Sequence, residues 1–201
     1  MSQTATISAP KVSPAAEERP RWRWTREAFA RMCEAGLFGP ADRVELIEGD
    51  IIALSPPNPL HSGAVRPNGR LLEDAFGLGF CARMEQPIVT GGDTQPQPDI
   101  AVCVGSDADF RRRFPVASEV RLIVEIADST VETDRVKGAV YATAEIAEYW
   151  ILNLRDQQLE VYRDPADGQY LSRRIYRPAE SVAPLGAPSQ ALVSVSALLG
   201  L

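Results

Sequence analysis

The chain has 201 residues, of which 45% are hydrophobic and 24% are charged, a composition typical of one globular domain with its own hydrophobic core. Its net charge of −6 argues against a protein that binds polyanions through a generally basic surface. No apolar run approaches the roughly 18 residues of a membrane helix, and the first residues lack the blocks of a signal peptide, so we expect a cytoplasmic protein.

The cysteines and the single histidine limit the kinds of metal site that the chain can form. Cys33, Cys81 and Cys103 are scattered and match neither a disulfide framework nor the spacing of zinc ligands, so we expect reduced thiols. His61 is the only histidine, which excludes a histidine-rich metal centre. It is also the only residue that could act as the base of a Ser-His-Asp triad.

The first third of the chain predicts a tail, a helix and a hairpin. Residues 1–20, rich in Ser, Ala, Pro and Glu, are expected to be flexible, so the folded domain is expected to span 21–201. Residues 25–36 predict an amphipathic helix with Thr25 as its N-cap and a glycine as its end. Two alternating apolar runs around a Glu-Gly-Asp turn predict a hairpin in residues 43–54.

The rest of the chain predicts a mixed sheet with helices. Residues 55–63 contain three prolines and predict a loop, and 64–77 have helical spacing that Pro67 and Gly69 weaken. The remaining elements are a helix at 134–146 and strands at 80–90, 98–104, 119–127, 148–154, 158–163 and 170–176. This order predicts an α/β or α+β fold, with a mixed sheet flanked by helices.

Two acidic residues are predicted to meet at one end of this sheet. Asp99 opens a strand directly after Pro98, and Glu125 lies within the next strongly apolar strand. Consecutive strands are often neighbours, so the two carboxylates can come together. Close carboxylates repel unless one takes up a proton, or both find cationic partners or share a cation. Magnesium suits such a pair, because it is commonly held by one or two carboxylates and water.

One lysine stands out for its rarity. Among 21 basic residues only Lys11 and Lys137 are lysines, and Lys11 lies in the expected tail. In the predicted helix Lys137 shares a face with Tyr141, so its ammonium could orient or deprotonate a water, or stabilise charge on phosphorus. A single such residue is more often structural, and only the combination of the two acids with Lys137 favours a catalytic site.

At these positions the chain resembles the Uma-type family of restriction endonucleases, a bacterial branch of the PD-(D/E)XK nuclease superfamily. The resemblance runs in order from about Trp24 to the C-terminus. The matching stretches are "RVELIEGDIIALSPPNPLH", "QPQPDIAV", "LIVEIADSTVETDRVK" and "VYATAEIAEYWILN". It implies a restriction-endonuclease-like fold and metal-dependent hydrolysis of phosphodiester bonds in DNA.

The resemblance also implies roles for individual residues. Asp99 and Glu125 would hold Mg²⁺ or Mn²⁺, and Glu45 would be an auxiliary acidic residue. The superfamily's usual lysine lies two residues beyond the glutamate, where this chain has Ala127. The resemblance therefore assigns that role to Lys137 in the following helix.

Five further residues have two interpretations each. His61 could approach phosphate or metal, or form hydrogen bonds within its loop. Asp134 could cap the helix that carries the lysine, or orient its ammonium. Arg111, Arg112 and Arg113 could contact DNA phosphates, or be solvated surface residues.

Three functions stay open on the sequence. The leading hypothesis is a Mg²⁺- or Mn²⁺-dependent DNA endonuclease, which could act as a homodimer because two copies cut both strands more easily than one. The alternative is a non-catalytic scaffold of the same fold that binds nucleic acid or protein, which the acidic net charge favours. A hydrolase built on His61 with Ser55 or Ser62 is the third, although the chain has no nucleophile-elbow motif.

Overall fold

The computed structural model describes residues 21–39, 41–56, 58–188 and 190–201. The predicted tail at 1–20 therefore lies outside the described residues. A six-stranded mixed sheet forms the centre, with strand order β3-β4-β5-β6-β7-β8. Its strands are β3 (Phe80–Met84), β4 (Ile100–Val104), β5 (Val120–Ala127), β6 (Glu148–Asn153), β7 (Gln158–Ala166) and β8 (Gln169–Tyr176). Strands β5 and β6 are parallel and the other neighbouring pairs are antiparallel, which confirms the predicted fold class.

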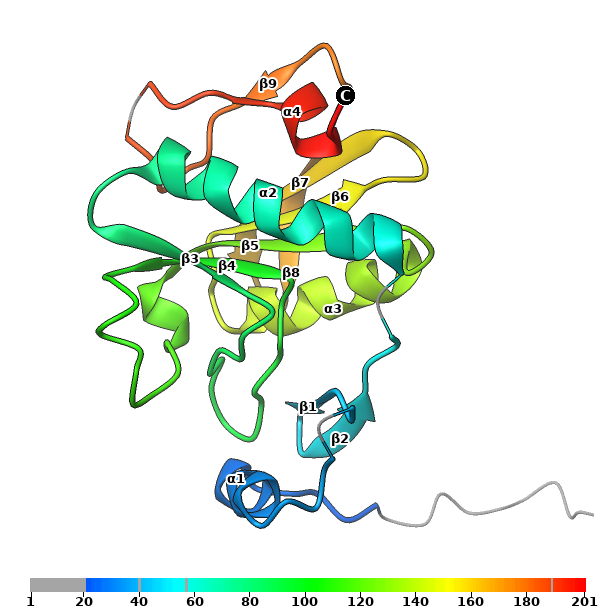
Figure 1. Cartoon of the computed structure of the whole chain (residues 1–201), viewed down its shortest axis with the longest axis vertical. Helices are drawn as coiled ribbons and strands as arrows, with labels where there is room; N and C mark the ends of the chain where they lie inside the picture. Colours follow the sequence, from blue (N-terminus) through cyan, green and yellow to red (C-terminus); the bar gives the residue numbers. More distant parts are fainter. Residues whose placement is uncertain (1–20, 40, 57, 189) are drawn as a thin grey trace, which may run out of the picture.

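Two long helices cover the two faces of this sheet, α2 (Pro59–Phe76) on one face and α3 (Val131–Thr143) on the other (Figure 1). Central strand β5 contributes side chains to both layers, because successive residues of a strand point to opposite faces. Leu122, Val124 and Ile126 belong to the cluster that packs under α2, whereas Ile123 and Ala127 belong to the cluster under α3. The same alternation places the side chain of Glu125 on the face that α3 covers.

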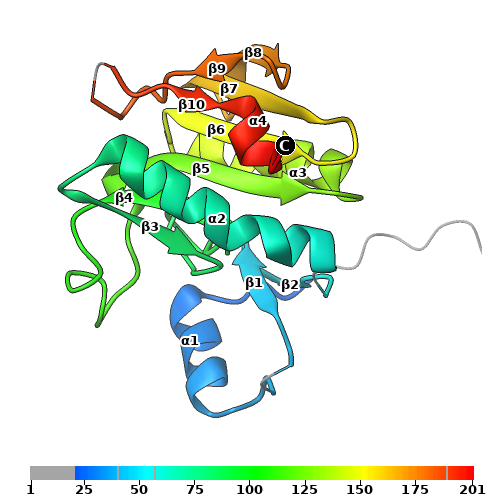
Figure 2. The same cartoon turned by 45° about the horizontal axis from the view of Figure 1, so that its top comes forward.

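The N-terminal elements form a separate layer beside the main sheet (Figure 2). Helix α1 (Arg26–Glu34) begins as predicted, with the Thr25 hydroxyl accepting a hydrogen bond from the backbone N–H of Ala28. Strands β1 (Val44–Ile47) and β2 (Asp50–Ala53) form the predicted hairpin. Its turn needs positive φ at both Glu48 and Gly49, which are the values observed. Backbone hydrogen bonds between Leu46 and Gln95 attach the hairpin to the loop before β4.

Helix α2 begins earlier than the sequence predicted, so the predicted loop at 55–63 is wrong over its second half. The side chain of Asn58 accepts a hydrogen bond from the backbone N–H of His61 at 2.9 Å. Pro59 follows as the first helical residue, where its missing N–H removes no helical bond. The cap and the proline together start the helix, and His61 therefore lies in its first turn.

The sequence predicted that Pro67 and Gly69 would weaken the first half of this helix, and the structure contradicts this prediction. The helix runs without interruption through Pro67 and Gly69. Gly69 is buried against β3, where an added Cβ would lie 2.5 Å from the Sδ atom of Met84. The glycine that weakens helix propensity thus permits close packing of α2 on the sheet, and tertiary contacts outweigh propensity.

Other boundaries also differ from the prediction, and strand β7 runs to Ala166, not to residue 163. Strand β3 ends at Met84, not at residue 90, because the chain turns at Glu85 with a φ of +51°. Helix α3 begins at Val131, three residues before the predicted start, and ends at Thr143. Four short elements were not predicted: η1 (Ala117–Glu119), β9 (Ser181–Val182), β10 (Val193–Ser194) and α4 (Val195–Leu199). None of the helices in the described ranges is long and apolar enough to cross a membrane.

The start of α2 provides a test of the helix cap. We expect Asn58→Ala to lower the free energy of unfolding by about 1–2 kcal/mol, because it removes the cap. It also removes the hydrogen bond from the Asn58 amide to Asp128. Urea unfolding measures the change, and Asn58→Ser, which keeps a capping oxygen, should lose less. Equal stability of the alanine and serine variants would contradict this account.

Candidate active site

Side chains from five parts of the chain line one cavity of about 270 Å³. It lies where the hairpin and the first turn of α2 meet the end of β5 and the start of α3. Five of its charged or titratable side chains lie close together: Glu45 of β1, His61 of α2, Asp99 just before β4, Glu125 of β5 and Lys137 of α3. All five are residues that the sequence singled out.

The pairing of β4 with β5 brings the first two carboxylates together. The strands are antiparallel with Ile100 opposite Val124, so Asp99 and Glu125 lie at the same end. The backbone N–H of Asp99 donates to Oε2 of Glu125 at 3.2 Å. The backbone N–H of Ile126 in turn donates to Oδ2 of Asp99 at 2.7 Å. The backbone of each strand therefore holds the carboxylate of its neighbour.

The Lys137 ammonium bridges two carboxylates. Its Nζ lies 2.9 Å from Oε2 of Glu45 and 3.0 Å from Oε1 of Glu125. The hydroxyl of Tyr141, one helical turn further along α3, donates to the same Oε1 at 2.7 Å. The backbone N–H of Gln97 donates to Oε2 of Glu45. The lysine is thus fixed between the hairpin and the central strand.

Burial and charge shift the ionisation of this pair. Burial raises the pKa of Glu125 well above its usual range, although the positive charge of Lys137 opposes the rise. Burial alone would lower the pKa of Lys137, but the charges and hydrogen bonds of Glu125 and Glu45 outweigh it and raise that pKa above the usual value. The two carboxylates therefore favour the charged form of the lysine, while burial disfavours the charged form of Glu125.

His61 contacts Asp99 directly. Its Nε2 lies 3.0 Å from Oδ2 of Asp99, and this hydrogen bond raises the pKa of the histidine against the opposing effect of burial. The other ring nitrogen, Nδ1, is buried and has no hydrogen-bond partner among the described residues. Within the same residues, neither Ser55 nor Ser62 forms a hydrogen bond with His61. The histidine therefore orients Asp99 in this structure and is not paired with a serine.

Asp134 lines the cavity but does not cap α3. The N-cap is Thr130, and Asp134 is the fourth residue of the helix, so the capping interpretation is wrong. Its carboxylate accepts a hydrogen bond from the Thr130 hydroxyl at 2.7 Å. Burial raises the pKa of Asp134 to about 6.

The three arginines at 111–113 follow β4 and do not line this cavity. Arg111 and Arg112 are exposed. Arg113 binds both oxygens of Glu119, at 2.6 and 2.7 Å, and this pairing lowers the pKa of Glu119 to about 2. A DNA-contacting role for these residues remains a prediction.

Some contacts of the site were missed by sequence reasoning. The spacing of Tyr141 from Lys137 placed both on one helical face, and that signal could have revealed its hydrogen bond to Glu125. Gln97 acts through its backbone, so its side-chain type carried no signal. The Asn58–Asp128 hydrogen bond at the rim joins segments 70 residues apart, which no local pattern indicates.

The donor set fits a hard divalent cation that keeps much of its water. The described residues contain no group of three or more His, Cys, Asp or Glu side chains arranged to hold a metal ion. A closed zinc site needs such a group, whereas Mg²⁺ is held by one or two carboxylates together with water and substrate oxygens. Asp99 and Glu125 supply that pair, so these residues fit Mg²⁺ or Mn²⁺.

Comparison with known proteins places the chain among nuclease-like folds. The structure is similar to the crystal structure of a putative nuclease belonging to DUF820 from Anabaena variabilis ATCC 29413, with a TM-score of 0.65 and 20% identity. The match covers 88% of this chain and 97% of that chain. No curated protein matches. The sequence profile of Uma2, described as "Putative restriction endonuclease", matches residues 26–196, and the chain therefore belongs to the Uma2 family.

Proposed function

We propose that the protein is an endonuclease that uses Mg²⁺ or Mn²⁺ to hydrolyse phosphodiester bonds in DNA. The observation that carries the proposal is the buried ammonium of Lys137 held between Glu45 and Glu125, beside the carboxylate of Asp99, in an open cavity. The names of the Uma2 family and of the structural neighbour, both nucleases by description, support it.

Each residue has a distinct task in this proposal. Asp99 and Glu125 would hold the metal ion, which supplies positive charge to the phosphate and lowers the pKa of a bound water. His61 keeps Asp99 in place through its Nε2 hydrogen bond. Tyr141 does the same for Glu125.

Lys137 has the role of a charge-stabilising group in this proposal, because its ammonium lies between two carboxylates. Its pKa is raised by two carboxylates, so it carries its proton at neutral pH and can donate a hydrogen bond. An ammonium in this place stabilises negative charge that builds on the phosphate oxygens. Glu45 holds the ammonium there and would not need to touch the metal.

A second candidate is a scaffold that binds nucleic acid or protein without cutting. Oδ2 of Asp99 is already occupied by the N–H of Ile126 and by His61, which favours this alternative. A shift in melting temperature on adding Mg²⁺ or Mn²⁺ separates the two, since a ligand of the native state must stabilise it. Loss of that shift in Asp99→Ala would support the nuclease.

The direct test is nicking of supercoiled plasmid with Mg²⁺ or Mn²⁺, and with EDTA as the blank. We expect Glu125→Gln to lower the rate by about 100-fold or more, because the charge of a metal ion contributes several kcal/mol. The matched control is Glu180→Gln, a half-buried residue beyond β8 and outside the cavity, which should nick like the natural protein. Nicking that survives in Glu125→Gln would refute the assignment. Cleavage of both strands at once would support the predicted homodimer.

A further inference from the structure

A second hollow, the α2–β3 groove, lies along α2 near the candidate active site. Its volume is about 650 Å³, and it lies between α2 and β3, the edge strand of the main sheet. Ser62 lines the groove and His61, its neighbour in the chain, lines the active-site cavity, so the two hollows adjoin. Figure 1 shows α2 lying along this side of the sheet, with its first turn towards the hairpin.

Three arginines give the groove its charge. Arg66 and Arg70 are exposed, lie one helical turn apart, and form no ion pair with any other described residue. Arg83 comes from β3, and its side chain is only 10% exposed. Its guanidinium carbon lies 5.3 Å from the centre of the Phe110 ring, and its buried Nε has no partner among the described residues.

Three acidic residues also line the groove, and none of them forms an ion pair with Arg66 or Arg70. Glu73 accepts a hydrogen bond from the backbone N–H of Ala82 at 3.0 Å. Glu85 pairs with Arg43 at 2.9 Å. Asp107 lies 4.0 Å from Arg83, at the limit of an ion pair, and its side chain is 83% exposed. The arginines thus remain available to an anionic ligand.

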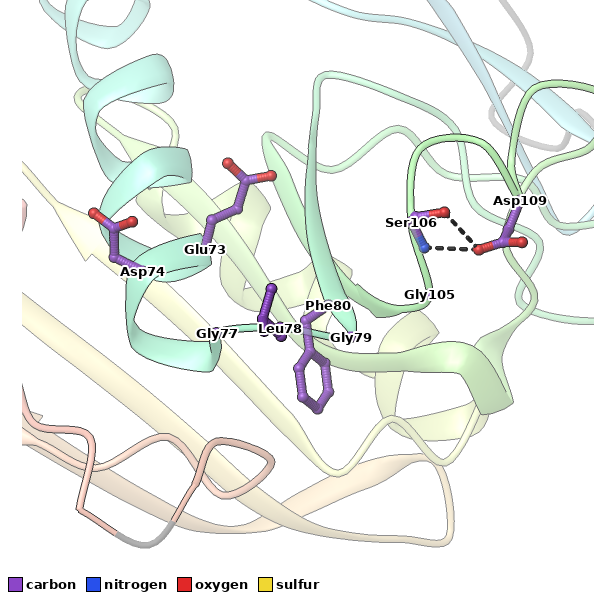
Figure 3. Close-up of a pocket in the computed structure, with 9 residues that line it drawn as sticks. All are labelled: Glu73, Asp74, Gly77, Leu78, Gly79, Phe80, Gly105, Ser106 and Asp109. Carbon is purple, nitrogen blue, oxygen red and sulfur yellow. Dashed lines mark hydrogen bonds between the residues drawn. The ribbon is translucent and has the colours of Figure 1, made fainter.

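The far end of the groove sets a limit to where such a ligand can lie. Beyond Glu73, the last turn of α2 borders a third hollow whose charged lining residues are all acidic: Glu73, Asp74 and Asp109 (Figure 3). The Asp109 carboxylate accepts two hydrogen bonds from Ser106, one from its backbone N–H and one from its hydroxyl, both at 2.8 Å. A polyanion would be repelled there, so we expect the ligand to lie along the arginines and to end near Arg70.

We propose that the α2–β3 groove binds the phosphate backbone of the DNA beside the bond that is cut. Arg66 and Arg70 lie about 6 Å apart along the helix axis, which lets them contact successive phosphates of one strand. Arg83 contributes a fixed charge at the floor of the groove. Guanidinium groups suit phosphate oxygens, and such contacts set the position of the duplex without reading its sequence. The inference rests on the proposed function, because that function places the scissile bond in the adjoining cavity.

Fluorescence anisotropy with a short fluorescein-labelled DNA duplex and the full chain tests the groove. EDTA is present throughout, so that binding is measured without cleavage. We expect the double variant Arg66→Gln/Arg70→Gln to bind about tenfold more weakly, since hydrogen bonds to charged groups are removed. The slope of log affinity against log salt should fall by about 0.9 for each phosphate that the variant no longer neutralises. Both side chains are exposed, and an unchanged melting temperature confirms folding.

The matched control is Arg174→Gln/Arg177→Gln, which removes the same charge at β8, the opposite edge of the sheet. The proposal is supported if this control binds DNA like the natural protein and the groove variant binds it more weakly. Equal loss in both variants, no loss in the groove variant, or no binding by the natural protein would overturn it. Binding without cleavage by the natural protein would reject the nuclease and keep the groove. Cleavage by the natural protein, together with unchanged DNA affinity in the groove variant, would support the nuclease and reject the groove.

Discussion

Lys137→Met is expected to lower metal-dependent plasmid nicking by at least about 100-fold, the usual effect of removing a positioned charge-stabilising donor. Methionine fills much of the space of the lysine stem but carries no charge. Nothing then remains between Glu45 and Glu125 to stabilise negative charge on the phosphate. The initial rate of nicking at saturating Mg²⁺ or Mn²⁺ measures the effect.

Two controls separate chemistry from folding in this experiment. Tyr141→Phe removes a hydrogen bond to Glu125 without removing a charge, so it should cost far less activity. Lys137→Met should also melt at a lower temperature, because it leaves buried carboxylates without their cation. Added Mg²⁺ should restore part of that loss if the carboxylates bind the metal. A rate within a few-fold of the natural protein would rule out the proposed role of Lys137.

The largest stability effect is expected from Arg163→Met, which should lower the free energy of unfolding by about 3–5 kcal/mol. Glu148 on β6 is fully buried, and Arg163 on β7 donates two hydrogen bonds to its Oε1, at 2.8 and 2.6 Å. The other contacts of this carboxylate are neutral donors, Trp150 Nε1 and the backbone N–H of Leu185. Removing the arginine leaves a buried charge without a cation.

Urea unfolding of the single variant and of Arg163→Met/Glu148→Gln checks this explanation. Glutamine keeps an oxygen for the Trp150 donor and carries no charge, so the double variant should regain much of the lost stability. If the two variants are equally unstable, the loss comes from packing of the arginine side chain and not from the uncompensated carboxylate.

The elements that the sequence predicted well are those with strong local signals. Alternating apolar residues and a Glu-Gly turn located the hairpin, and a run of branched aliphatics located β5. The start of α2 was missed because its Pro-Asn-Pro segment is equally typical of a loop, and only the contact of Asn58 with His61 shows it to be a helix cap. Strand β3 was drawn too long because residues near Val89 have strand-like composition but form only an isolated bridge to Val116.

The parts of the candidate site that follow from strand order could be predicted. The parts that depend on how the hairpin packs against α3 could not. Asp99 and Glu125 meet because consecutive strands pair, and the rarity of lysine singled out Lys137. The contact of Glu45 with that lysine joins the β1–β2 hairpin to helix α3 across 92 positions of the chain, so only the family resemblance indicated it. The pairing of Arg163 with the buried Glu148 had no local signal either, because the two residues meet only when β6 and β7 pair.

The hairpin that carries Glu45 shares no strand with the six-stranded sheet. Its attachments include the hydrogen bonds of Leu46 to Gln95 and of Gly49 to Asp93, the bond from Gln97 to Glu45, and the ion pairs of Glu45 with Lys137 and of Arg43 with Glu85. Such an attachment can open locally while the hydrophobic core stays folded. Warming should then abolish cleavage before the main sheet melts, and hydrogen exchange in β1 should outpace that in β5. Enzyme activity would report on docking of the hairpin, and melting would report on the sheet.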